Sequence, residues 1–228
     1  MAASLRLVRW QRWRLVIITA LVLLGLRVLG GIVYEYRLYF PANFKEATFL
    51  IGREASFTPL YATAFYTHIL SGPPTILLAG FLVWSGGTAR LRVWHRWGAR
   101  LLIFLIVVLL VPSGLLMAPR AFAGPIAAAA FIVLSLATAI SAGCTLYYAR
   151  ARRFAVHQRW ALRCFLLLVS PLLLRVVSGT LMVIGYEEPL GYQVNAWLSW
   201  LVPLVAYEAW LWSMRIGTAV ETKLHPSS

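Results

Sequence analysis

Three histidines, and the arginines beside two of them, are the residues of this 228-residue chain whose types could support chemistry. His95 and His157 each stand where a long apolar stretch begins, next to Trp and Arg, whereas His68 lies inside such a stretch. A neutral imidazole can ligate haem iron, and a bis-histidine site needs two imidazoles from different helices at one depth. His95 and His157 meet the depth condition, so they are candidate axial ligands of a haem b.

The arginines near these two histidines could pair with the haem propionates, because a guanidinium binds a carboxylate through two parallel hydrogen bonds. Arg100 and Arg163 are the candidates for this role, with Arg96 and Arg159 close by in sequence. The alternative is that His95 and His157 are ordinary interfacial residues that bind nothing.

A second polar group lies deeper in the apolar stretches and consists of His68, Arg175, Arg27 and Glu208. A charged side chain in mid-membrane costs at least about 2.5–3.5 kcal/mol, so each needs a partner or a purpose. At about 1.5 Å per residue, the first three fall near the midplane or slightly outside it, and Glu208 falls in the inner half. They could bind an anionic or quinone-like molecule or relay protons, or they could be a structural network between helices.

The amino-acid composition indicates the class of protein that positions these residues. Hydrophobic residues make up 61% and charged residues 12% of the chain, which excludes an ordinary soluble domain. A net charge of +14 could indicate a nucleic-acid partner. That partner is not expected here, because the cations stand in short clusters between long apolar runs.

Six segments are long and apolar enough to span a bilayer as helices, which takes about 20 residues. They are approximately 15–34, 57–85, 99–118, 125–148, 161–186 and 193–214. We therefore expect an all-α integral membrane bundle, forming a single transmembrane domain over residues 1–218. Residues 219–228 are expected to be a disordered cytoplasmic tail, and residues 35–56 either a short interfacial helix or an ordinary connector.

The cations predict the orientation. If the N-terminus is inside, the cytoplasmic segments hold 15 Lys and Arg residues and the external segments hold 4. The positive-inside rule then places both termini in the cytoplasm. This predicts a multi-pass protein of the inner (cytoplasmic) membrane, with anionic lipids at its cytoplasmic face.

A weak internal repeat relates the third and fifth segments. Residues 94–100 and 157–163 open them with similar His, Trp and Arg patterns, and Ser113-Gly114 and Ser178-Gly179 lie near their ends. Either a helix pair is duplicated, in parallel orientation, or two apolar helices resemble each other by chance.

Other familiar chemistry is missing from the sequence. There is no Gly-rich phosphate loop, paired-cysteine metal motif or nucleophile elbow, and the chain contains no Asp. Cys144 and Cys164 are expected to be small membrane-embedded thiols. Whether the protein is an enzyme is therefore left open.

The motifs around the three histidines resemble a family of bacterial predicted membrane proteins of unknown function. Its marks are a His-Arg-Trp-x-Gly-Arg stretch, matched from His95, and a later His-x-x-Trp-Met-x-Arg, matched from His157. Ala99 replaces the glycine of the first mark, and Ala161 the methionine of the second. The resemblance covers about residues 60–185 and implies no activity.

More loosely, histidines on successive helices resemble the two-haem membrane b-type cytochromes and the transmembrane ferric reductases. Those proteins place four histidines at two depths, whereas this chain has two at the inner level and one farther out. The resemblance implies at most one complete bis-histidine site.

We expect a b-type cytochrome-like electron carrier or a haem-binding accessory subunit, with a quinone or redox partner. The alternatives are a small transporter or channel-like bundle with a His68/Arg175 site, and a non-catalytic structural or assembly subunit.

Overall fold

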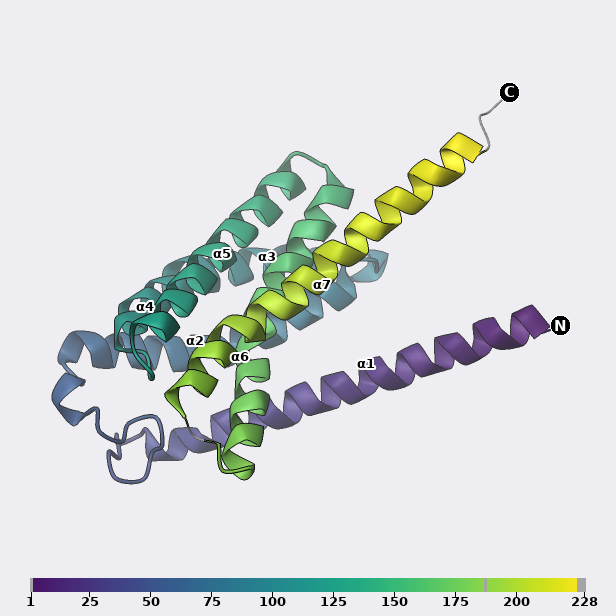
Figure 1. Ribbon diagram of the computed structural model, residues 1–228. Coiled ribbons are helices and arrows are strands. Elements are labelled where there is room, and N and C mark those ends of the chain that lie inside the picture. The colour runs from purple at the N-terminus through teal and green to yellow at the C-terminus, as the bar shows by residue number, and fades with distance from the viewer. Residues whose placement is uncertain (1, 187, 225–228) are drawn as a thin grey trace. The chain divides into compact units, whose positions relative to one another are not determined.

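The computed structural model describes residues 2–186 and 188–224, with side chains from 12 to 186 and from 188 to 214 (Figure 1). Within these ranges the chain is helical and contains no strand. Five helical segments are long and apolar enough to cross a membrane, judged by length and composition alone: Arg12–Leu38, Pro59–Ser85, Ala89–Arg120, Pro125–Arg150 and Phe154–Val183. The prediction of an all-α membrane bundle is therefore confirmed.

Contacts divide the chain into two units, Met1–Phe57 and Thr58–Ser228. The single domain predicted for residues 1–218 therefore stays a prediction. The first unit consists of helix α1 (Ala2–Glu35) and the segment that follows it. That segment contains two 3-10 turns, Tyr36–Leu38 and Glu54–Ser56, and no α-helix. The alternative of a short interfacial helix in 35–56 is thus wrong, and the connector is the correct description.

The second unit is built from helical hairpins. Helix α2 (Pro59–Ser85) packs against a composite helix made of α3 (Arg92–Phe104), a π-helical segment (Leu105–Leu110) and α4 (Val111–Met117). Helix α5 (Pro125–Arg150) packs against α6 (Phe154–Val183), and α7 (Pro189–Leu224) packs against both.

Several helices extend beyond the predicted spans. Helix α1 begins at Ala2, α3 at Arg92 and α6 at Phe154, so basic and aromatic residues at the membrane boundary continue these helices. Long Arg side chains reach the headgroups from such positions. At the other end of the chain, α7 continues to Leu224, whereas the sequence predicted disorder from residue 219. Residues 225–228, with His225, lie outside the described residues.

The sixth predicted span, 193–214, is helical but differs in character. It lies within α7 and carries Gln193, Asn195 and Glu208, and it is not one of the five apolar segments. That α7 crosses the membrane therefore stays a prediction. The bundle helices alternate in direction along the chain, because each hairpin reverses it.

The packing of the second unit is that of a membrane bundle. Large apolar side chains such as Leu77, Val107 and Leu173 face outward, where a bilayer would solvate them. The interior contains alanines and small hydroxyl residues, which allow helix backbones to approach closely. The buried polar residues of this unit, within the part the structure describes, are Ser71, Thr75, Ser85, Ser113, Thr138, Ser141, Ser170, Asn195 and Ser199.

The π-helical segment has an identifiable cause. Pro112 has no backbone N–H and cannot continue the helical ladder, so the turn before it widens. The Ser113 hydroxyl, directly after this proline, donates to the backbone carbonyls of Leu109 at 2.5 Å and of Leu110 at 3.1 Å. The widened turn lies beside His68 of α2.

Candidate functional site

The imidazole of His95 is held by a residue at the end of the preceding helix, α2. Its Nδ1 lies 3.1 Å from the hydroxyl of Ser85, the last residue of α2, and Ser85 is buried. The Ser85 hydroxyl has a backbone carbonyl, that of Leu82, within 3.5 Å. If the hydroxyl donates to this carbonyl, it accepts from Nδ1–H, and the lone pair of His95 is then on Nε2.

The imidazole of His157 is held by a residue of the preceding helix, α5. Its Nδ1 lies 2.9 Å from the backbone carbonyl oxygen of Thr145 in α5. A carbonyl oxygen can only accept, so Nδ1 must carry the proton, and in the neutral ring the lone pair is on Nε2. This is the arrangement of metal-ligating histidines, which donate their other N–H to a carbonyl or similar group.

His95 and His157 stand at the starts of two different helices, α3 and α6. Both are half-buried. The structure therefore places both residues at one end of the bundle, and their pairing stays a prediction.

The two arginines that were predicted to bind haem propionates, Arg100 and Arg163, have different surroundings in the structure. Arg100 is exposed and stacks on Trp97, with its guanidinium carbon 4.6 Å from the ring centre. Arg163 forms a bidentate pair with Glu208 of α7, Nε to Oε1 at 2.5 Å and Nη2 to Oε2 at 2.9 Å. The pair joins α6 to α7.

This pairing corrects the grouping made from the sequence. Glu208 was placed with His68, Arg175 and Arg27, but its carboxylate binds Arg163 from the inner group. The guanidinium of Arg163 also lies over Trp160, at 4.6 Å, and near Tyr207. A charge already neutralised in this way is a poor partner for a propionate, so Arg163 holds α6 to α7.

His68 is packed into the contact between α2 and α4. Its Nδ1 lies 3.2 Å from the hydroxyl of Ser113, which follows the widened turn. A Cβ added at Gly114 would lie 3.3 Å from Cε1 of His68 and 3.1 Å from Oγ of Ser135. The glycine therefore makes the space in which the imidazole lies.

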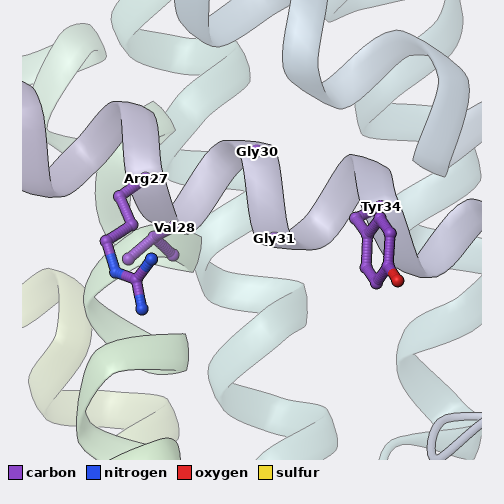
Figure 2. A pocket seen from close by; sticks show the side chains of 5 residues that line it. All are labelled: Arg27, Val28, Gly30, Gly31 and Tyr34. Atoms are coloured by element: carbon purple, nitrogen blue, oxygen red, sulfur yellow. The ribbon is translucent and has the colours of Figure 1, made fainter.

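The remaining two predicted residues lie elsewhere. Arg175 is on an exposed face of α6. Arg27 belongs to α1 in the first unit, where it and Tyr34 project from one side of the helix with Gly30 and Gly31 between them (Figure 2). A joint site of His68, Arg175 and Arg27 therefore stays a prediction.

Sequence reasoning missed Ser85, Thr145 and Asn195. Asn195 of α7 donates from Nδ2 to the hydroxyl of Ser178 and to the carbonyl of Leu174, both at 2.9 Å. Ser178-Gly179 is the counterpart of Ser113-Gly114 in the weak repeat, so in both places the serine contacts a polar side chain from another helix. The repeat was the signal that could have directed attention to Asn195.

Other candidate ligands are scattered. Cys144 and Cys164 are free thiols. No three His, Cys, Asp or Glu side chains are placed to hold a metal ion in the part of the chain that the structure describes. An axial pair needs only two ligands, so this finding leaves the haem hypothesis untested.

Comparison with known proteins identifies a family for this chain. Neither the curated proteins nor the solved structures contain a match to this chain. A family model matches residues 65–212, a stretch that includes His68, His95 and His157 and leaves out α1. This chain belongs to the family described as "Predicted membrane protein (DUF2306)".

Proposed function

We propose that this protein is a b-type cytochrome-like electron carrier or haem-binding accessory subunit, with His95 and His157 as the two axial ligands of one haem b. The observation that carries the proposal is the tethering of the imidazoles. His157 donates from Nδ1 to a backbone carbonyl and His95 is bound at Nδ1 by Ser85, and both residues stand at the same end of the bundle. Haem supplies one-electron redox chemistry when it is bound.

The protein's own groups would do three things for such a cofactor. Ser85 and the Thr145 carbonyl fix the orientation of the rings and, by accepting from Nδ1–H, raise the basicity of Nε2. The basic rim with Arg100 provides donors for propionates at the membrane boundary. The Arg163–Glu208 pair fixes α6, which carries His157, against α7.

We also infer the cellular setting from the charge distribution. The basic clusters around 90–100 and 150–163 stand at the same end of the bundle as His95 and His157. Facing the cytoplasm, these clusters would contact anionic lipids of the inner membrane, and a redox partner or quinone would exchange electrons with the protein.

A structural role is the second candidate function, and the packing of His68 favours it. The imidazole bonds to Ser113 and occupies the space left by Gly114, so it contributes to helix packing without any ligand. In that case the bundle is a non-catalytic assembly subunit.

The haem content of the purified protein tests the proposal. Protein expressed with an ample supply of haem precursor and purified in mild detergent should contain about one haem b per chain by the pyridine haemochrome assay. Protein that is folded by gel filtration but colourless would refute the proposal and leave the structural role.

A further inference from the structure

Arg27 is the charged residue of the apolar segment 15–34 of α1, which contains no other. It stands 13 residues after Arg14 and eight before Glu35, where the helix ends. At the helical rise these intervals are about 20 Å and 12 Å, so Arg27 lies within the hydrocarbon when α1 spans a bilayer. A charged side chain at that depth is costly and almost always pairs with another group. Arg27 therefore requires a partner.

The chain itself supplies no carboxylate at the depth of Arg27. Its acids are seven glutamates, and none of them stands between residues 55 and 186. Glu208 alone lies within a predicted span, and its two carboxylate oxygens bind Nε and Nη2 of Arg163. Glu35 follows along α1 but is about 12 Å away at the helical rise. Among the side chains that the structure describes, no carboxylate pairs with Arg27, so the counter-charge must come from outside the chain.

The face of α1 that carries Arg27 is notched beside the charge. Gly30, Gly31 and Tyr34 follow Arg27 at intervals of three, four and seven residues, which places all four on one face of the helix (Figure 2). A Cβ added at either glycine would meet nothing within 4 Å. Glycines at such positions let the backbone of another helix approach closely in a membrane. The face therefore combines a charge with room for a helix beside it.

The contact between α6 and α7 shows how this protein satisfies an arginine in its helical bundle. Arg163 binds the carboxylate of Glu208 from the neighbouring helix in a bidentate pair. A bidentate pair is planar and directional, so it requires a carboxylate at a matching depth. A second copy of α1 would instead bring one Arg27 toward another, and like charges repel. The charge of Arg27 therefore favours a different helix, one that carries an acid.

We propose that this face of α1 binds one transmembrane helix of another protein, which carries a Glu or Asp at the depth of Arg27. The carboxylate accepts hydrogen bonds from the guanidinium, and the backbone of the partner helix packs into the notch at Gly30 and Gly31. A lipid phosphate does not fit the same place, because the headgroups lie about 12 Å or more from Arg27 along the helix. The proposal does not rest on haem binding.

Association with model helices in phosphatidylcholine vesicles tests this surface. The probes are three leucine-rich transmembrane peptides that carry one Glu, Gln or Leu at the depth of Arg27, each labelled with an acceptor dye. Energy transfer from a donor dye at the C-terminus of the full chain measures their binding. The Glu peptide should associate at least about tenfold more strongly than the Gln and Leu peptides, because it alone neutralises the charge. Equal association of the three peptides would overturn the proposal.

Two variants of α1 separate the charge from the notch. Arg27→Leu should abolish the preference for the Glu peptide. Gly31→Leu keeps the charge but fills the notch, and it should weaken binding of that peptide several-fold without a clash inside the chain. Gly143→Leu in α5 is the matched control, since a Cβ there also meets nothing within 4 Å, and it should leave binding unchanged. A Glu preference that survives Arg27→Leu, equal effects of the two glycine variants, or dimerisation of the chain that depends on Arg27 would overturn the proposal.

Discussion

The Nδ1 atom of His157 lies 2.9 Å from the backbone carbonyl oxygen of Thr145, across the hairpin of α5 and α6. The partner is a main-chain atom, so the tether depends on the hairpin itself and not on a particular side chain. His95 is held across its own hairpin by the side chain of Ser85. This difference makes the contributions of the two histidines experimentally separable.

Ser85→Ala should loosen His95, because it removes the hydroxyl that binds Nδ1. Loss of such a supporting group typically costs about 10–100-fold in affinity for the metal centre. We expect weaker haem retention and a shifted reduction potential, measured by haem titration and redox potentiometry. Thr145→Ala is the matched control and should change neither quantity, since the carbonyl remains. Identical behaviour of the two variants would contradict the positioning role of Ser85.

Breaking the Arg163–Glu208 pair on one side should destabilise the protein. Arg163→Leu or Glu208→Leu leaves an unpaired charge in an apolar zone, at a cost of about 2.5–3.5 kcal/mol if that charge stays in the membrane. Glu208 is 45% exposed, so the effect in aqueous detergent should be smaller. The double variant should recover most of the lost thermal stability, because it removes both charges. Additive losses in a double-mutant cycle would show that the pair is not coupled.

Gly114→Ala should destabilise the contact between α2 and α4. The added Cβ would approach Ser135 Oγ and His68 Cε1 to 3.1 and 3.3 Å, so the imidazole must shift. Gly179→Ala is the counterpart in the repeat and meets nothing within 4 Å. Thermal denaturation should therefore show a lower midpoint for the first variant and an equal or higher one for the second. A similar drop in both would mean that helix flexibility, and not the fit of His68, sets the requirement.

Both termini are expected in the cytoplasm. Reporter fusions after Ser228 and within 86–95 should report the cytoplasmic side, and a fusion within 36–50 the external side. An external C-terminus would mean that one predicted span does not cross the membrane. Helix α7 would then be the first candidate, because it carries Gln193, Asn195 and Glu208.

The sequence predicted the features that follow from composition and periodicity. The five apolar segments, the all-α class and the location of His95 and His157 at one end could be derived, because span length and helix rise determine depth. The first residues of α3 and α6, Arg92 and Phe154, could not be predicted. Arginines at the membrane boundary continue a helix while their charged groups reach water.

The contacts between helices could not be predicted from the sequence. Glu208 and Arg163 are 45 residues apart, and only the packing of α7 on α6 brings them together. The depth estimate placed Glu208 in the inner half, but it could not identify Arg163 as the partner, because rotation about the helix axis is not contained in a depth estimate. The π-helical turn before Pro112 was likewise missed, although proline is its cause.

The most direct test of the haem proposal is the reduced-minus-oxidised absorption spectrum of the purified protein and three histidine variants. Two imidazole ligands should give a low-spin spectrum with sharp α and β bands in the wild type. His95→Ala and His157→Ala should each abolish these bands or convert them to a high-spin form, whereas His68→Ala should retain them. Bands that survive both inner substitutions, or that disappear with His68→Ala in a folded protein, would contradict the assignment of His95 and His157 as the axial pair.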